Sequence, residues 1–288
     1  LCPHDCAIVD GGRGACAVRY NLGGRLYTLV YDAVVASTID PVEKKPLFHF
    51  YPGSTAYSVA TVGCNLRCAF CQNWEIAQWP KEHLPKRFIP SAHGDQVESS
   101  APDLSALRSV PGRRVTPEQI VEEALQSGSR SIAYTYTEPT IFYELAYDTA
   151  LLAHSKGLKN IFVTSAFIRE APLRRIAAVL DAVNIDLKFF REESYRRISR
   201  ARLKPVLDAI RLYHELGVWT EVTTLIMPGV NDSDDELRKI AEFVCSVGPE
   251  VPWHVSRFHP SYKMLEVPST PLETLRRVEN PDSRNRLL

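Results

Sequence analysis

The chain has 288 residues, and 45% of them are hydrophobic, which is enough to form a core without disulfide bonds. Lysine plus arginine equals aspartate plus glutamate, at 34 each, so net charge gives no support for a nucleic-acid partner. No apolar run approaches the ~20 residues that a membrane span needs, and no secretory signal pattern is present. We expect a cytoplasmic protein whose thiols stay reduced, with no nucleic-acid or membrane partner.

Residues 1–55 are irregular in pattern. They contain glycine pairs, three cysteines and two short strand-like runs, at Ala15–Arg19 and Arg25–Val35. We expect this segment to be a small N-terminal region that binds metal through its cysteines.

A regular alternation of strands and helices begins after residue 55. Thr116, Pro117 and Gln119 match a capping box with proline in the first turn. The six expected strands are Tyr57–Val62, Ser131–Tyr136, Asn160–Ser165, Ala182–Leu187, Trp219–Ile226 and Trp253–Phe258. The first expected helix begins at Thr116. The others span Ile141–Ser155, Pro172–Leu180, Pro205–Leu216 and Ser233–Cys245, and Asp232 or Ser233 is the expected cap of the last.

Alternating strands and helices indicate a parallel sheet in an α/β fold. Six units are too few for a complete eight-stranded barrel, so we expect a partial (β/α)6 TIM-like barrel over residues 56–265. An open doubly wound sheet is the alternative. Residues 80–113 are rich in proline, serine and charge without a clear period, which predicts a long, partly disordered insertion. Residues 266–288 form a C-terminal tail.

The seven cysteines form two clusters and one isolated residue. An odd, clustered set in a reducing compartment favours metal binding over disulfides. Cys245 lies alone in a helical pattern, and we expect it to be a buried thiol that packs as a small hydrophobe.

Cys64, Cys68 and Cys71 directly follow the first expected barrel strand. Cysteine thiolates are the usual ligands of iron–sulfur clusters, and a loop of these spacings is long enough to curl around a cube. Three ligands leave one iron without a protein thiolate, and an open coordination position suits substrate chemistry. A zinc site completed from elsewhere and a redox dithiol of Cys68 and Cys71 are the alternatives.

The CxxxCxxC spacing after the first strand resembles the radical S-adenosylmethionine (SAM) signature. The wider sequence resembles one branch, the radical SAM enzymes of the AmmeMemoRadiSam system, which are often labelled pyruvate formate-lyase-activating-like. The resemblance covers nearly everything except residues 80–113 and the segment after about 275. Its matching stretches are Leu1–Arg19, Pro41–Gln78, Ile132–Tyr143, Val183–Lys188, Glu221–Ser233 and Trp253–Pro260.

This resemblance implies a [4Fe–4S] cluster on Cys64, Cys68 and Cys71 whose open iron chelates SAM. It implies an enzyme that cleaves SAM reductively to methionine and a 5′-deoxyadenosyl radical, which abstracts hydrogen from a substrate. The electron comes from an external donor of the flavodoxin or ferredoxin type. The substrate is a backbone glycine of a partner enzyme, a small molecule, or another protein of the same system. A zinc-binding or structural metalloprotein without radical chemistry is the alternative.

The candidate SAM-binding residues follow the C-terminal ends of expected strands, where barrels build their active sites. Glu138 lies in Tyr-Thr-Glu-Pro-Thr, where radical SAM enzymes usually read Gly-Gly-Glu-Pro. The resemblance implies that its carboxylate or backbone binds the SAM ammonium. Alternatively, Glu138 caps the following helix. Ser165 stands where related enzymes have Asn followed by Gly, and its hydroxyl is a candidate partner for the SAM carboxylate.

Asp186 and Lys188 alternate on the fourth strand, so both point to the barrel interior. The resemblance assigns them to SAM, and a structural ion pair is the alternative. His259 follows the sixth strand and is a candidate for the ribose or adenine, or a core histidine.

Cys2, Cys6 and Cys16, with His4 among them, form a second candidate metal site. Both zinc and an auxiliary iron–sulfur cluster fit these residues.

Overall fold

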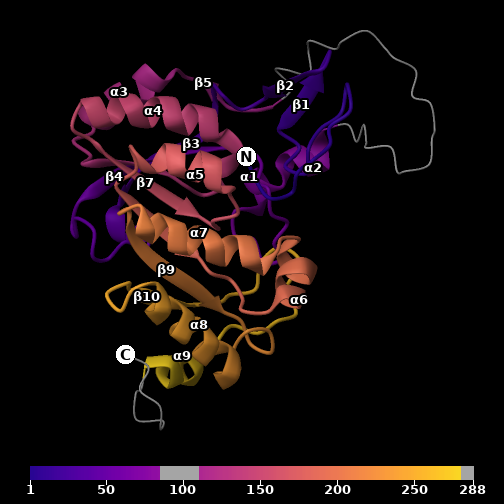
Figure 1. Ribbon diagram of the computed structural model, residues 1–288, viewed down its shortest axis with the longest axis vertical. Coiled ribbons are helices and arrows are strands. Elements are labelled where there is room, and N and C mark those ends of the chain that lie inside the picture. The colour runs from indigo at the N-terminus through magenta and orange to yellow at the C-terminus, as the bar shows by residue number, and fades with distance from the viewer. Residues whose placement is uncertain (85–109, 280–288) are drawn as a thin grey trace, which may run out of the picture.

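The computed structural model describes residues 1–84 and 110–279 (Figure 1). Within those residues the main sheet has eight strands in the order β10-β9-β8-β7-β6-β4-β3-β5. Neighbouring strands from β4 to β10 are all parallel, which confirms the expected partial (β/α)6 barrel. The six parallel strands of the described residues are β4 (Thr55–Thr61), β6 (Ser131–Tyr134), β7 (Lys159–Thr164), β8 (Ala182–Asp186), β9 (Trp219–Ile226) and β10 (Trp253–Arg257).

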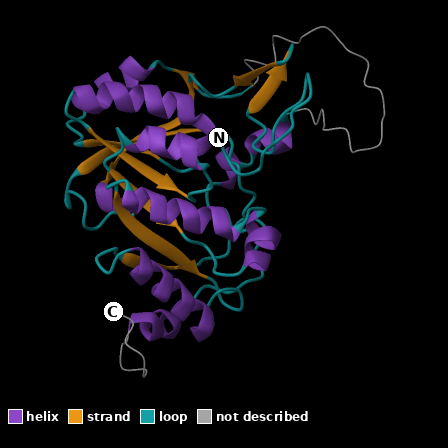
Figure 2. Cartoon of the chain, in the orientation of Figure 1, coloured by secondary structure: helices purple, strands orange, loops and turns teal. Residues whose placement is uncertain are grey.

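The helices that connect these strands lie on one face of the sheet (Figure 2). They are α3 (Pro117–Gln126), α4 (Tyr143–Ser155), α5 (Glu170–Ala177), α7 (Leu203–Glu215) and α8 (Asp234–Val247). Helix α9 (Leu272–Glu279) follows the last strand, β10. The capping box is confirmed, because the Thr116 hydroxyl accepts from Gln119 N and the Gln119 side chain accepts from Thr116 N. Ser233 caps α8 by accepting from the Glu236 backbone N–H at 3.4 Å.

The prediction that Cys245 is buried is wrong, because the residue is exposed. Helix α8 buries Leu237, Ile240 and Val244 along one stripe. Successive helical residues are about 100° apart, so Cys245 turns away from this stripe.

Strand β3 (Ala33–Pro41) pairs antiparallel with β4 and so joins the N-terminal residues to the main sheet. The hairpin of β1 (Arg19–Leu22) and β2 (Arg25–Thr28) precedes it. The expected strand over Ala15–Arg19 is wrong except for its last residue. Ala17 has φ of 63° and donates to the Gly14 carbonyl at 2.8 Å, which makes a turn there. The domain boundary placed at residue 55 stays a prediction.

The chain between β3 and β4 closes the N-terminal end of the barrel. We call residues 42–50 the floor segment. It begins with the short helix η1 (Val42–Lys44). Val42 and Leu47 are fully buried in a small apolar cluster at the starts of the parallel strands, with Ala56, Ala133, Ile161 and Ala182. The Pro46 carbonyl accepts from Asn184 of β8 at 3.0 Å, so the floor segment is tied to the sheet by both packing and hydrogen bonds.

A buried ion pair holds the floor segment from inside the barrel. Lys45 is 1% exposed, and its Nζ lies 2.7 Å from Asp40 Oδ2. Asp40 also accepts from Lys44, Ser58 and the hydroxyl of Tyr136. Burial alone would raise the pKa of Asp40, but hydrogen bonds from the two lysines and the tyrosine hold it well below its usual range.

The segment predicted as a long loop, residues 80–113, has ordered ends. Helix α1 (Trp74–Ala77) is followed by α2 (Trp79–His83), which has Pro80 in its first turn. Strand β5 (Arg113–Arg114) pairs with β3. The loop prediction is therefore wrong at both margins. Its centre, residues 85–109, and the end of the predicted tail, residues 280–288, lie outside the described residues.

Within the described part of the chain, no helix combines the length and apolar character needed to cross a bilayer.

Candidate active site

The candidate residues follow the C-terminal ends of the parallel strands. The cysteines follow β4, Glu138 follows β6, Ser165 follows β7, Asp186 ends β8 and His259 follows β10. Because the carboxyl ends of parallel strands meet at one edge of the sheet, these residues lie at the same end of the barrel. The floor segment closes the opposite end.

The cysteine loop begins at a glycine that no other residue replaces easily. Gly63 has φ of 101°, and a Cβ at this position would lie 2.8 Å from Val18 Cγ1. The N-terminal segment therefore packs directly against the start of the loop. Cys64 Sγ accepts from Leu66 N at 3.3 Å, which folds the loop back on itself.

The rest of the loop is held by segments that are distant in the sequence. Arg67 N donates to Ser199 O and Ala69 N donates to Ile198 O, at 2.9 and 3.0 Å. Both acceptors belong to the single-turn π-helix η4 (Tyr195–Ser199). Cys68 Sγ lies 3.3 Å from Ser199 Oγ, so η4 also contacts a candidate ligand directly. Single π-helical turns occur frequently at functional sites.

The three thiols are held in a desolvated site that contains lysines. Burial raises the pKa of all three cysteines, that of Cys71 to about 11. The positive charges of Lys81 and Lys188 act in the opposite direction and favour the thiolates. Three thiols beside two lysines match the donor chemistry of an iron–sulfur site, because coordination deprotonates a thiol and leaves an anion.

Asp186 and Lys188 form an ion pair, which was the structural alternative for these two residues. Lys188 Nζ lies 2.9 Å from Asp186 Oδ2. Burial alone would lower the pKa of Lys188, but Asp186 and Cys68 outweigh it and raise that pKa, so the ammonium is retained. Asp186 is 41% exposed, whereas Lys188 is 11% exposed. The carboxylate therefore keeps access to a ligand while its partner is buried.

Glu138 points into the protein and is fully occupied there. One carboxylate oxygen accepts from Thr140 N, Thr140 Oγ1 and Thr164 Oγ1, and the other accepts from Ser165 N at 2.9 Å. The side chain caps the short helix η3 (Pro139–Phe142), in line with the structural alternative for this residue. Burial raises the pKa of Glu138, although these hydrogen bonds oppose the rise.

Two residues near the site adopt a backbone conformation that favours glycine, although both carry side chains. Tyr136 has φ of 62° and Ala166 has φ of 52°. Residues with a Cβ adopt this left-handed region at a cost of order 1–3 kcal/mol. At Tyr136 several contacts impose the conformation: its carbonyl accepts from Asn73 at 2.8 Å, its hydroxyl bonds Asp40, and its ring lies 4.6 Å from Lys45 Nζ.

Ser165 and His259 differ in how far they join the site. Ser165 is buried, and its backbone N–H is bound by Glu138. His259 is exposed, and Nδ1 lies 3.2 Å from Ser269 Oγ. Among the described residues, no hydrogen bond or ion pair joins His259 to the three cysteines.

The three N-terminal cysteines lie near one another and beside the main site. Cys2 is close enough to Cys6 and Cys16 for their charges to raise its pKa, after the larger effect of burial. His4 Nε2 lies 2.7 Å from the Asn65 carbonyl in the cysteine loop. The segment therefore docks on that loop.

Lys81 is a site residue that the sequence analysis missed. Its Nζ donates to the Leu66 carbonyl at 2.6 Å and to Gln78 Oε1 at 2.9 Å, and it is among the charges that act on Cys64. Lys81 falls at the start of the segment predicted as a loop. The Trp79-Pro80 pair, with proline at a helix start, was the available signal.

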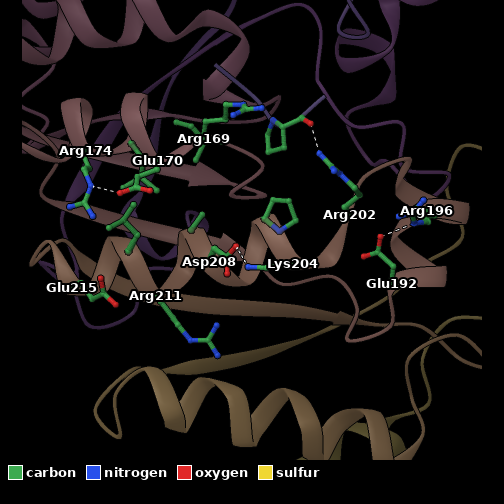
Figure 3. A pocket seen from close by; sticks show the side chains of 16 residues that line it. Arg169, Glu170, Arg174, Glu192, Arg196, Arg202, Lys204, Asp208, Arg211 and Glu215 are labelled. Carbon is green, nitrogen blue, oxygen red and sulfur yellow. Dashed lines mark hydrogen bonds and ion pairs between the residues drawn. The ribbon is translucent and has the colours of Figure 1, made fainter. Parts of the chain in front are cut away.

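A charged surface pocket of about 700 Å³ is lined mainly by residues of α5 and α7 and by Pro3 (Figure 3). Its arginines are largely paired with carboxylates. Arg174 lies 2.7 Å from Glu170, and Arg196 lies 2.7 Å from Glu192 of α6 (Glu192–Ser194). Figure 3 shows these pairs on the rim of the pocket, and none of the candidate site residues lines it.

Comparison with known proteins agrees with this geometry. The family model described as the radical SAM superfamily matches residues 58–244. A protein of Methanocaldococcus jannaschii named "Uncharacterized protein MJ0808" is 43% identical over 97% of this chain and 76% of its own length. The pyruvate formate-lyase-activating enzyme of Streptococcus mutans is 22% identical, over 63% of each chain.

Solved structures share the fold at low identity. SuiB of Streptococcus suis is 13% identical and matches with a TM-score of 0.53, over 76% of this chain and 43% of SuiB. A radical SAM methyltransferase of Sphaerobacter thermophilus is 18% identical with a TM-score of 0.52, over 80% of this chain and 63% of its own. With the cysteine loop, the parallel barrel and the family match in agreement, the chain belongs to the radical SAM superfamily.

Proposed function

We propose that this chain is a SAM-dependent radical enzyme of the pyruvate formate-lyase-activating type, within the AmmeMemoRadiSam branch, and that Cys64, Cys68 and Cys71 hold its [4Fe–4S] cluster. The observation that carries the proposal is the cysteine loop at the carboxyl edge of the barrel, with Lys188 beside Cys68 and the exposed Asp186 carboxylate next to it. When bound, the cluster supplies the electron that cleaves SAM into methionine and a 5′-deoxyadenosyl radical.

The surrounding residues bind and orient. Lys188 stabilises the Cys68 thiolate by its charge and fixes Asp186, which is free to accept from a SAM hydroxyl or ammonium. Glu138 acts on SAM through the backbone that it shapes, since its carboxylate holds the Ser165 N–H and the Thr164 hydroxyl. The Ser165 hydroxyl would donate to the SAM carboxylate, and His259 would contact the ribose or adenine.

The electron donor in this proposal is an external flavodoxin or ferredoxin. The substrate is a backbone glycine of a partner protein, which the likeness to the Streptococcus mutans activating enzyme supports. A peptide-sized substrate has a parallel in SuiB, one structure of which holds its precursor peptide SuiA. A partner purified from cells grown on deuterated glycine should transfer deuterium to 5′-deoxyadenosine. Label-free product from an otherwise active mixture would remove the glycine substrate and leave SAM cleavage standing.

The direct test of SAM cleavage is anaerobic. The reconstituted protein should be brown and, with dithionite and SAM, should form 5′-deoxyadenosine. Cys68→Ala should lose both colour and product, because it removes a cluster ligand. Cys245→Ala is the matched control, since that thiol is exposed on α8, and it should keep both. Product formation by the Cys68→Ala variant would contradict the assignment, and a colourless protein that carries zinc at these thiols would favour the structural alternative.

We also propose that Cys2, Cys6 and Cys16 bind a second metal, either zinc or an auxiliary cluster. The triple variant with alanine at residues 64, 68 and 71 is compared with a variant that also has alanine at residues 2, 6 and 16. Iron–sulfur absorbance in the triple variant would identify an auxiliary cluster, and one zinc ion per chain more than in the second variant would identify a zinc site. Equal metal content in the two variants would overturn the proposal.

A further inference from the structure

Three side chains from distant parts of the sequence converge at the floor of the barrel. His49 comes from the floor segment, Glu221 from the start of β9 and His254 from the start of β10. One ligand atom from each lies within 4.8 Å of the other two. Glu221 Oε2 is 2.6 Å from His254 Nε2 and 3.4 Å from His49 Nδ1. These residues lie at the opposite end of the strands from the cysteine loop.

The hydrogen bonds of Glu221 leave a single acceptor position for two imidazoles. Oε1 accepts from the His49 backbone N–H and the Trp219 indole, and Oε2 accepts from the Phe48 backbone N–H, all at 3.0 Å. A carboxylate has about four acceptor sites. Two backbone N–H groups and the Trp219 indole fill three of them. The fourth faces both imidazole nitrogens, and a cation placed there would satisfy all three groups at once.

The surroundings of Glu221 also resemble those of a metal-binding carboxylate. Ligating carboxylates are commonly oriented by hydrogen bonds from a second set of groups, as the two backbone N–H donors and Trp219 do here. The Glu221 side chain is fully buried, His254 is 18% exposed and His49 is 57% exposed. The cluster therefore has a rigid inner ligand and an outer ligand open to solvent, which gives an ion a path of entry.

The donor set selects the class of ion. Two imidazoles with one carboxylate suit borderline divalent transition metals such as Zn²⁺, whereas Mg²⁺ and Ca²⁺ prefer oxygen ligands. We propose that His49, Glu221 and His254 bind one divalent transition-metal ion, of which Zn²⁺ is the probe. The site is independent of the proposed SAM chemistry.

The position of the site gives the ion a structural role. β10 is the last strand at one edge of the sheet, while the floor segment connects β3 and β4 near the other edge. An ion held by His49 and by the two strands would tie the floor segment to that far edge. In barrels of this kind, residues at the N-terminal face contribute to stability, whereas catalytic residues lie at the C-terminal face.

The test is zinc binding by the cluster-loaded protein, so that the cysteines of the radical site are occupied. After equilibrium dialysis against Zn²⁺, the wild type should carry one zinc ion per chain more than His49→Ala or His254→Ala. Loss of a residue that only hydrogen-bonds to a metal ligand already weakens metal binding by about 10–100-fold. Loss of a direct ligand should therefore weaken Zn²⁺ binding by at least about tenfold. Zinc should also raise the melting temperature of the wild type by more than that of His49→Ala.

His214→Ala is the matched control, because its Nε2 also lies 3.4 Å from a glutamate, Glu250, without a third ligand. It should bind zinc as the wild type does. His49 is largely exposed, so its replacement keeps the fold even if His254→Ala does not. Equal zinc content in the wild type and His49→Ala, together with equal zinc-dependent melting, would overturn the proposal and leave a hydrogen-bonded cluster without an ion.

Discussion

The two ends of the barrel differ in how far their charged side chains are buried and hydrogen-bonded. At the cysteine end, Asp186 is 41% exposed, and Cys64 and Cys68 each have one hydrogen-bond partner among the described residues, so the site has unused binding capacity. At the floor, Asp40 and Glu221 are buried, and nearly every acceptor position is filled. A buried carboxylate whose acceptor positions are filled makes its surroundings rigid. A partly exposed carboxylate beside a buried cation can instead bind a ligand.

The largest effect that would sharpen this comparison is expected at the floor. Asp40→Asn keeps the shape of the side chain but leaves Lys45 buried without a counter-ion. Removing one partner of a buried ion pair costs about 3–5 kcal/mol, so the free energy of unfolding in urea should fall by that amount. Lys204→Ala breaks the exposed pair with Asp208 and should cost about 0–1 kcal/mol. Similar losses in both variants would show that the floor pair is no more important than a surface pair.

At the cysteine end, Lys188→Met should affect binding more than folding. It removes the cation that fixes Asp186 and faces Cys68. Hydrogen bonds to charged groups contribute about 1.5–3 kcal/mol, so KM for SAM in 5′-deoxyadenosine formation should rise about 10–100-fold. Lys159→Met is the control, because Lys159 also pairs with an aspartate, at 2.7 Å, but at the N-terminal edge of the sheet. An equal rise of KM in both variants would contradict a specific role of Lys188 in SAM binding.

Glu138→Gln tests a carboxylate that lies at the cysteine end but, like the buried carboxylates of the floor, accepts hydrogen bonds at both of its oxygens. Either orientation of the amide places its NH₂ against a backbone N–H, that of Thr140 or of Ser165. We expect the free energy of unfolding to fall by about 1–3 kcal/mol. KM for SAM should rise only together with this loss of stability, because the same hydrogen bonds hold the Ser165 backbone of the proposed SAM site. A raised KM at unchanged stability would instead assign the carboxylate to SAM.

The smallest effect is expected at Ala166. Its φ of 52° suits glycine, so Ala166→Gly should raise the free energy of unfolding by up to about 1 kcal/mol, after the entropy cost of glycine is subtracted. Ala178→Gly is the control. Ala178 has φ of −62° at the end of α5, and the same change there should lower stability by about 0.5–1 kcal/mol. Stabilisation at both positions would contradict the strain at Ala166.

The sequence predicted the parts of the fold that depend on local pattern. The six parallel strands, the caps at Thr116 and Ser233, and the placement of the cysteines after β4 all follow from periodicity and residue type. The floor segment was not predicted, because its burial comes from contacts with strands far along the chain. Lys81 and His49 were missed for the same reason: each lies in a short segment without a period, and only folding brings it to its partners.

The pairing of Tyr136 with both ends of the molecule has a mechanical consequence. Its hydroxyl reaches Asp40 near the floor, while its carbonyl is held by Asn73, two residues past the last cysteine of the loop. Tyr136 therefore links the buried ion pair of the floor directly to the segment that follows the cysteines. A glycine at this position would relieve the left-handed backbone but would remove this link, so the connection between the two ends of the barrel depends on one side chain.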